Sequence, residues 1–342
     1  MEEITRISID TSKHVFTLHG SDREGRAVLR RNVRRHEVVR YFEKMKPLEV
    51  AMEACGGSHH WGRTLQALGH RVRLIPPQYV KPFVKRSKND RNDAQAISEA
   101  ANRPEMRDVP VKSVGVQAEA MLLSVRELLM RQRTQLINAL RGHATEFGLT
   151  AAKGDKGLAA LRAEIAAVPD TVLPAVAAEA LQLLGGEIDR IATRLAQTDK
   201  LMMRRHRASE ASRRLGHIPG VGPVVALSFA TRVDASQFCS GRHFAAWLGL
   251  VPKQNTTGGK TRLGPISRAG DERLRQLLVL GATAVIRHAR PGSPTASPWL
   301  LKLLERKPRK LAAVALANKM ARIIWAMLAR GDDYRRPDKV AA

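Results

Sequence analysis

The order of short strand-like and helix-like segments over the first hundred residues constrains the fold more than any other feature of this sequence. Alternating apolar and polar residues predict strands, and apolar residues at three- and four-residue spacing predict helices, in the order β-β-β-α-β-α-β-α. The strands are expected at residues 4–10, 15–19, 27–30, 48–53 and 71–75. A mixed α/β domain is therefore predicted for residues 1–110.

Acidic residues stand at the ends of these predicted elements. Asp10 ends the first strand, Glu53 ends the fourth, and Asp90 and Asp93 open the last helix. Two acids three residues apart share one helix face, and a protein tolerates their repulsion mainly when a cation lies between them. The alternative is a solvated first helical turn, where acids are favoured.

This element order is that of an RNase H-like fold, in which the first and fourth strands are neighbours. The four carboxylates would then meet at one edge of the sheet. Carboxylate oxygens suit two Mg²⁺ ions, with Mn²⁺ as an alternative. Two such ions about 3.5–4 Å apart activate a nucleophile and stabilise the leaving oxygen in phosphodiester chemistry.

The charge of the chain indicates a polyanionic partner. Its 58 Lys and Arg against 32 Asp and Glu give a net charge of +26, which favours nucleic acid. Residues 201–342 carry 26 Lys and Arg against 8 Asp and Glu, whereas residues 111–200 carry 11 against 10. We therefore predict three domains, at residues 1–110, 111–205 and 206–342.

Other classes of protein are disfavoured. Cys55 and Cys239 are far apart and outside any C-x-x-C spacing, which argues against a zinc module. No apolar run approaches eighteen residues, so we expect no membrane partner. The expected location is the cytoplasm.

The middle domain reads as long helices. Apolar residues recur at helical spacing over residues 116–147, 158–165 and 172–203, with near-neutral charge. The pattern favours an antiparallel coiled-coil arm. Such an arm could mediate dimerisation or could merely cover the core.

The basic C-terminal domain is predicted to be helical and opens with a glycine motif. Residues 215–226 read as a helix-hairpin-helix, in which Gly220 and Gly222 let backbone N–H groups approach a phosphate. An ordinary glycine turn between two core helices is the alternative.

Residues 252–262 are predicted to form a basic, hydroxyl-rich glycine loop, and residues 267–271 a second turn. The loop lacks the spacing of a Walker phosphate-binding loop, but its composition suits a scissile phosphate. The side chains expected to contact nucleic acid are basic and come from these segments and the helix that follows: Lys253, Lys260, Arg262, Arg268, Arg273 and Arg275.

Taken together, these motifs make the chain similar to a known family. It resembles the DEDD-type insertion-sequence transposases, which form the one-ten family of insertion sequences, and within it the eleven-eleven subgroup. The resemblance covers nearly the whole chain and rests on the segments Ile9–Lys13, Met52–Trp61, Lys88–Ala94, Ile218–Pro223, Leu248–Pro252, Gly258–Lys260 and Leu263–Ser267.

The resemblance implies a RuvC-like domain whose DEDD tetrad is Asp10, Glu53, Asp90 and Asp93, followed by a helical arm and a C-terminal transposase domain. It also implies a recombinase whose homodimers pair into tetramers. A noncoding guide RNA (bridge or seeker RNA) would base-pair with both donor and target DNA, so that the RNA selects the sequence.

One departure concerns the nucleophile. In the family, a serine in the glycine loop is the presumed nucleophile, but here the matching position is Thr256 or Thr257. A threonine hydroxyl is capable of attack, although its methyl group crowds the approach. The threonine is either natural, a sign of decay or a substitution that stops turnover; Ser267, and after it Ser240, are the reserve candidates.

Three functions are therefore considered. The first is an RNA-guided DNA recombinase that uses the carboxylates together with a loop hydroxyl. The second is a RuvC-like metal-dependent nuclease that cuts DNA by water hydrolysis. The third is an inactive relic that still binds nucleic acid.

Overall fold

The computed structural model describes residues 3–85, 89–293 and 296–335 of a chain that divides into two compact units, Met1–Gln117 and Ala118–Ala342. The protein combines a β-sheet with many helices, so the predicted mixed α/β character is confirmed. Lys88, at the start of the predicted acidic motif, lies outside the described residues. The division into three domains, with boundaries after residues 110 and 205, stays a prediction.

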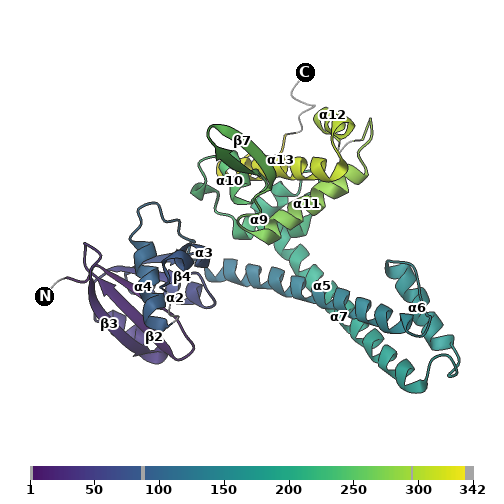
Figure 1. Cartoon of the computed structure of the whole chain (residues 1–342), viewed down its shortest axis with the longest axis horizontal. Coiled ribbons are helices and arrows are strands. Elements are labelled where there is room, and N and C mark those ends of the chain that lie inside the picture. The colour runs from purple at the N-terminus through teal and green to yellow at the C-terminus, as the bar shows by residue number, and fades with distance from the viewer. Residues whose placement is uncertain (1–2, 86–88, 294–295, 336–342) are drawn as a thin grey trace. The chain divides into compact units, whose positions relative to one another are not determined.

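The first unit is built on a five-stranded mixed sheet with the strand order β3-β2-β1-β4-β5 (Figure 1). Strands β1, β2 and β3 are antiparallel, whereas β1, β4 and β5 are parallel. Ile9 pairs with Met52, which confirms that the first and fourth strands are neighbours. The strands are Arg6–Asp10, Val15–Ser21, Ala27–Arg34, Glu49–Glu53 and Arg71–Ile75.

Side chains alternate along each strand, so the sheet presents two different faces. One face packs against α1 (Val38–Glu43) and α2 (Ser58–Ala67), with a short 3-10 turn at Arg35–Glu37 before α1. This face forms an apolar core whose largest buried side chains are Ile7, Ile9, Phe16, Leu18, Phe42, Met52, Leu65 and Leu74.

The opposite face packs against α4 (Asp90–Ala101), which follows α3 (Pro77–Val80) and the 3-10 turn Lys81–Phe83. The apolar residues of α4 at helical spacing, Ala94, Ile97 and Ala101, are buried. This interface is more polar than the first, because it also buries Ser8, His19, Ser21 and Ser98.

Long helices begin the second part of the chain. They are α5 (Val114–Thr145), α6 (Asp155–Ala167) and α7 (Ala175–Ala208). Helices α5 and α7 run antiparallel, because Glu119 pairs with Arg205 and Arg126 pairs with Asp199 further along. Apolar residues from all three helices form a core of their own, which includes Leu140, Leu161, Ile165, Leu181 and Ile188.

The remaining helices surround the largest apolar core of the described chain. They are α8 (Glu210–Leu215), α9 (Pro223–Arg232), α10 (Gly241–Trp247), α11 (Glu272–Arg287), α12 (Pro298–Arg306) and α13 (Arg309–Arg330), with a 3-10 turn at Ala235–Gln237.

Within the described residues, α13 is the helix whose length and mean hydropathy would permit it to cross a membrane. It serves here as a core helix, and contributes Ala317, Met320, Ala321 and Ile324 to the C-terminal core.

The predicted all-helical C-terminal domain is corrected by a two-stranded antiparallel sheet. Strand β6 (Pro252–Thr257) pairs with β7 (Lys260–Ile266), and together they form a hairpin where we predicted a loop. The hairpin carries β-branched threonines on both strands, which favour extended backbone. Gly258 and Gly259 make its turn.

Candidate functional site

Asp10 is placed by the alternation of β1. Ile7 and Ile9 point into the apolar core and are no more than 1% exposed, so Ser8 and Asp10 point to the face that α4 covers. Because β1 is the central strand, Asp10 is only half-exposed even though it ends the strand.

Asp90 and Asp93 lie in the first turn of α4. Asn89 caps this helix: its side-chain oxygen accepts a hydrogen bond from the backbone N–H of Asn92 at 2.9 Å. Their three-residue spacing puts both acids on the helix face that meets the end of β1. The positive end of the helix dipole favours acids at this position.

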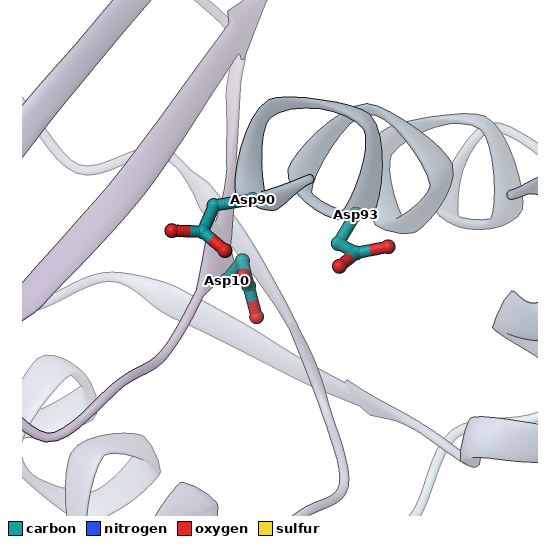
Figure 2. A group of neighbouring side chains, drawn as sticks. All are labelled: Asp10, Asp90 and Asp93. Atoms are coloured by element: carbon teal, nitrogen blue, oxygen red, sulfur yellow. The ribbon is translucent and has the colours of Figure 1, made fainter. Parts of the chain in front are cut away.

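These three acids converge. One carboxylate oxygen from each of Asp10, Asp90 and Asp93 lies within 4.8 Å of the other two. Figure 2 shows Asp10 at the strand end beside the carboxylate of Asp90, with Asp93 further along the same helix. A set of carboxylate oxygens at this spacing suits a hard divalent cation.

The fourth predicted acid, Glu53, lies beside this cluster rather than within it. Met52 is the parallel partner of Ile9, so the next residue on β4, Glu53, stands alongside Asp10 at the sheet edge. Its carboxylate does not join the 4.8 Å group among the described residues. Its charge nevertheless acts on Asp10, as the pKa of that acid indicates.

Burial and the crowding of negative charge raise the pKa of two of these acids. Burial, followed by the charges of Asp93, Asp90 and Glu53, raises the pKa of Asp10 to about 6. Burial and the charge of Asp93 also raise the pKa of Glu53. A carboxylate that is hard to ionise beside other carboxylates is a sign of a site that gains from a cation.

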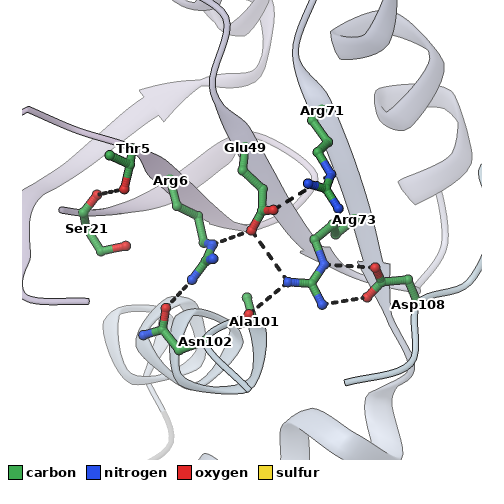
Figure 3. A network of polar contacts seen from close by, with 9 residues as sticks. All are labelled: Thr5, Arg6, Ser21, Glu49, Arg71, Arg73, Ala101, Asn102 and Asp108. Carbon is green, nitrogen blue, oxygen red and sulfur yellow. Dashed lines mark hydrogen bonds and ion pairs between the residues drawn. The ribbon is translucent and has the colours of Figure 1, made fainter. Parts of the chain in front are cut away.

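Sequence reasoning missed the polar network that anchors the other end of α4 (Figure 3). Arg73 donates to both carboxylate oxygens of Asp108, at 2.8 and 3.1 Å, and to the carbonyl of Ala101 at 2.8 Å. Glu49 accepts from Arg6 and Arg73, and Arg6 also donates to Asn102. The signal was the alternation of Arg71 and Arg73 along the predicted strand at residues 71–75.

The hydroxyl candidates Thr256 and Thr257 lie on β6 and are exposed. Their segment forms a hairpin because Gly258 and Gly259 adopt φ values of 57° and 77°, as a two-residue turn requires. The Gly-Gly pair between alternating residues was the signal that should have predicted it. The Oγ1 of Thr256 lies 3.2 Å from the Oγ1 of Thr261 on the facing strand.

Most of the predicted basic contacts are accessible on or near this hairpin. Lys253, Lys260, Arg262 and Arg268 are exposed. Arg273 is half-buried, with its guanidinium 3.4 Å from the carboxylate of Glu127.

Arg275 is a correction to the predicted nucleic-acid contacts. Its side chain is buried, and its guanidinium donates to the carbonyls of Leu248 and Ala269 at 3.1 and 2.8 Å. It ties the base of the hairpin to the end of α10. The close approach of the hairpin base to the end of α10 also requires glycine at position 270, because a Cβ there would lie 1.9 Å from the carbonyl oxygen of Trp247.

The two glycines of the predicted helix-hairpin-helix differ in their surroundings. A Cβ at Gly220 would lie 2.7 Å from the carbonyl oxygen of Gly281, so Gly220 allows the α8–α9 turn to pack closely on α11. Gly222 caps α9 with open space around it. The helix-hairpin-helix stays a prediction, with Gly222 as its accessible glycine.

The reserve serines have local structural roles. Ser240 caps α10 and accepts a hydrogen bond from the backbone N–H of His243 at 3.2 Å. The backbone N–H of Ser267 donates to the carbonyl of Val251 at 2.8 Å, which closes the base of the hairpin.

Comparison with known proteins gives consistent matches. A family model described as "Transposase IS116/IS110/IS902 family" matches residues 212–296, which include the hairpin. A DEDD transposase model of the IS110 type, described as "Transposase", matches residues 7–148, which include all four acids.

Relatives match over nearly the full chain. A putative transposase of Sinorhizobium fredii is 51% identical over 99% of this chain and 87% of its own length. A probable family 20 transposase of Pseudomonas aeruginosa is 47% identical over 97% of this chain and 99% of its own. The transposase for insertion sequence element IS1111A of Coxiella burnetii is 41% identical over 98% of this chain and 92% of its own.

Proposed function

This chain belongs to the IS116/IS110/IS902 family of transposases, and from that membership we propose that it is an RNA-guided DNA recombinase that excises and inserts an insertion sequence. The observation that carries the proposal is the meeting of Asp10, Asp90 and Asp93 within 4.8 Å at the end of a central strand. Such a site suits chemistry on a phosphodiester.

We assign Asp10, Asp90 and Asp93 as ligands of Mg²⁺ or Mn²⁺, with Glu53 completing the set. The donors fit, because all are carboxylate oxygens and the raised pKa of Asp10 reflects charge that a cation would offset. When bound, the metal supplies positive charge to the reacting phosphate. The strand order β3-β2-β1-β4-β5, with acids at the ends of β1 and β4, supports the RuvC-like assignment.

We assign the nucleophile to Thr256 or Thr257, which are exposed on β6 among Lys253, Lys260 and Arg262. In this step the threonine oxygen bonds to phosphorus and the P–O bond to the departing strand breaks. The proton given up by the threonine hydroxyl passes through solvent to the departing oxygen, so the departing strand ends in a free hydroxyl. Attack by a strand hydroxyl on the phosphothreonine reverses these bonds and joins the new DNA ends.

The remaining parts of the proposal concern partners. Donor DNA, target DNA and a noncoding guide RNA are all polyanions, and the net charge of +26 supports contact with them. Only 4% of the residues are aromatic, which favours backbone contacts over base stacking. The chain would act on chromosomal DNA at the bacterial nucleoid.

We propose that homodimers form through α5 and pair into tetramers. Met121, Val125 and Leu128 follow one another at four- and three-residue steps on α5, and each is more than 40% exposed. An apolar stripe of this spacing suits a partner helix.

The test is capture of a covalent protein–DNA adduct. The full chain is incubated with donor DNA, target DNA, guide RNA and Mg²⁺, then denatured and examined for protein whose mobility is shifted by DNA. We expect an adduct that depends on Mg²⁺ and disappears in Asp10→Asn. Peptide mapping of the adduct identifies the threonine.

A second function is a metal-dependent nuclease that uses water as the nucleophile. The observation that favours it is the threonine where the family has a serine. Cleavage that requires Asp10 but never produces an adduct would establish this nuclease and exclude the recombinase. The third function, a relic that only binds nucleic acid, is excluded by Mg²⁺-dependent cleavage of any kind.

A further inference from the structure

A second polar site lies next to the acidic cluster, on the same face of the sheet. It is a cavity of about 240 Å³ between β2, β3 and the first turns of α4. We call it the His19 pocket and define it by five of the six polar residues that line it: Thr17, His19, Arg30, Asn32 and Arg91. The sixth, Arg31, borders the cavity, but its guanidinium lies over the Tyr41 ring.

The register of the sheet links this pocket to the acids. Asp10 pairs with Thr17, which pairs with Asn32, and His19 pairs with Arg30 in the next row. Residues directly opposite each other on antiparallel strands point to the same face. Strands lie about 4.8 Å apart, so the pocket begins about one strand spacing from Asp10. That is the scale of a nucleotide step along a DNA strand.

His19 is the buried polar group of the pocket. It is only 5% exposed, and no hydrogen-bond partner for its ring is recorded in the described parts of the chain. Burial, followed by the charge of Arg30, lowers the pKa of His19 below its usual range. The ring nitrogens of His19 are not among the described side-chain atoms that are enclosed without a partner, so they are open to the pocket, where a ligand or water can supply a hydrogen bond.

Two arginines flank the opening with their charges unneutralised. Arg30 comes from β3 and Arg91 from α4; both are exposed, and neither has an ion pair within the described residues. Guanidinium groups bind phosphate oxygens with two parallel hydrogen bonds. The hydroxyl of Thr17 and the amide of Asn32 add neutral donors.

We propose that the His19 pocket binds a backbone phosphate of the DNA strand whose scissile phosphate is held at Asp10, Asp90 and Asp93. The inference rests on the proposed function of that acidic cluster. Its consequence is a positioning role: Arg30 and Arg91 would fix the strand on one side of the reacting phosphate, as phosphate contacts set register without reading sequence.

Arg31 provides a matched control. It follows Arg30 and also borders the pocket, but its side chain alternates to the opposite face of the sheet, where the guanidinium lies 5.2 Å from the centre of the Tyr41 ring. Arg31→Gln removes the same charge at almost the same place. An effect of net charge alone would be equal in Arg30→Gln and Arg31→Gln.

The experiment measures binding of the full chain to fluorescein-labelled dT10 by anisotropy in EDTA, where no cleavage occurs. We expect Arg30→Gln/Arg91→Gln to weaken binding about fivefold or more and to reduce the salt slope by about 1–2. Arg31→Gln is expected to change affinity less than twofold. Asn32→Ala, at an exposed position, is the second variant and should weaken binding in the same direction.

Further arms distinguish the source of the phosphate. Inorganic phosphate should compete weakly with dT10 for binding to the wild type and should not compete for binding to the double variant. If phosphate saturates the pocket without any loss of dT10 binding, the pocket is a site for the free ion only. A larger loss for rU10 than for dT10 would overturn the DNA assignment in favour of RNA.

Equal losses in Arg30→Gln and Arg31→Gln, or no loss in the double variant, would refute the pocket. Because these measurements are made without metal, failure here is separate from failure to form the covalent adduct, which tests the recombinase itself.

Discussion

At the scale of single residues, the acidic cluster concentrates like charge on Asp10. The pKa of this acid rises from 3.8 to about 6 in the folded protein because of burial and its carboxylate neighbours. Ionised Asp10 therefore lowers the free energy of unfolding above about pH 6 when no cation is bound. The penalty fades as the pH falls through 6 toward 4, where the carboxyl is protonated in the folded chain.

We expect Asp10→Asn in EDTA to raise the free energy of unfolding at pH 7.5 by about 1–2 kcal/mol, a figure reduced for solvent screening at a half-buried site. The gain should vanish near pH 4. Thermal unfolding followed by circular dichroism across this pH range measures it. Glu43→Gln is the control, because it removes one exposed negative charge of α1 outside the acidic cluster. A loss of stability in Asp10→Asn at pH 7.5 would contradict the proposed repulsion.

The two threonines of β6 make a second prediction at this scale. The hydroxyl of Thr256 lies within hydrogen-bond distance of the Thr261 hydroxyl and accepts a hydrogen bond from the side-chain amide of Gln254. Thr257 lies next to the turn and pairs with Lys260 on the facing strand. If one of them is the nucleophile, replacing it with serine removes a methyl group that crowds in-line attack. We therefore expect Thr256→Ser or Thr257→Ser to speed strand exchange, and the matching valine variant to abolish it.

Strand exchange on supercoiled donor DNA, quantified with guide RNA present, measures this effect. Valine keeps the shape and strand preference of threonine, so loss of activity in one valine variant alone identifies the reacting hydroxyl. Unchanged rates of strand exchange in all four variants would show that neither threonine of the hairpin is the nucleophile.

At the scale of elements, close approach of backbones decides which glycines matter. Gly281 is inside α11, and a Cβ there would lie 2.1 Å from the carbonyl oxygen of Gly220. Gly186 is inside α7 with open space around it. Alanine normally stabilises a helix relative to glycine, so helix propensity favours alanine at both sites. Packing disfavours alanine at Gly281 alone.

We expect Gly281→Ala to lower the free energy of unfolding by about 3 kcal/mol, because the α8–α9 turn must move away from α11. Gly186→Ala should raise it by up to about 1 kcal/mol. Differential scanning calorimetry of the full chain measures both. Equal and small effects would show that the turn does not depend on the Gly220–Gly281 contact.

The placement of α4 is a second property of elements. Arg73 holds the end of this helix through the carbonyl of Ala101 and also binds Asp108 and Glu49, all at a side chain only 12% exposed. Arg71, two residues earlier, is 80% exposed and lies 3.9 Å from Glu49. The two arginines share a strand but differ in what they support.

We predict that Arg73→Met costs about 2 kcal/mol and increases hydrogen exchange in the last turns of α4, since it removes the hydrogen bonds from Arg73 to Asp108 and to the carbonyl of Ala101. Arg71→Met is the control and should leave exchange unchanged. Protection of α4 that survives Arg73→Met would show that its apolar contacts alone hold the helix.

At the scale of the whole molecule, positive charge is concentrated toward the C-terminal part of the sequence. The hairpin contributes Lys253, Lys260 and Arg262, all exposed. Each phosphate that such a side chain neutralises releases a counterion, so affinity falls with salt in proportion to the number of contacts.

We expect neutralising these three hairpin residues with glutamine to reduce the slope of log affinity against log salt by about 3 for a duplex DNA. The matched control removes three exposed charges from α5 and α7, in Arg131→Gln/Arg194→Gln/Lys200→Gln, and should leave the slope nearly unchanged. Equal slopes for both triple variants would show that net charge, not the hairpin, governs binding.

Local pattern determined much of this protein. Strand alternation and helical spacing predicted the elements of the first unit and placed acids at the ends of β1 and β4 and at the start of α4. Such features depend on neighbours in sequence, so they can be read without tertiary contacts. The hairpin is also encoded by neighbouring residues, but we predicted a loop there because we did not recognise the Gly-Gly turn.

Only the tertiary structure decided which of these residues meet. It brought Asp10 to Asp90 and Asp93 while leaving Glu53 at their side, and it turned Arg275 from an expected phosphate contact into a buried support. It also aligned His19 and Arg30 in one row beside the acids. Distances between side chains far apart in sequence follow from strand order, register and the packing of α4, which no local pattern encodes.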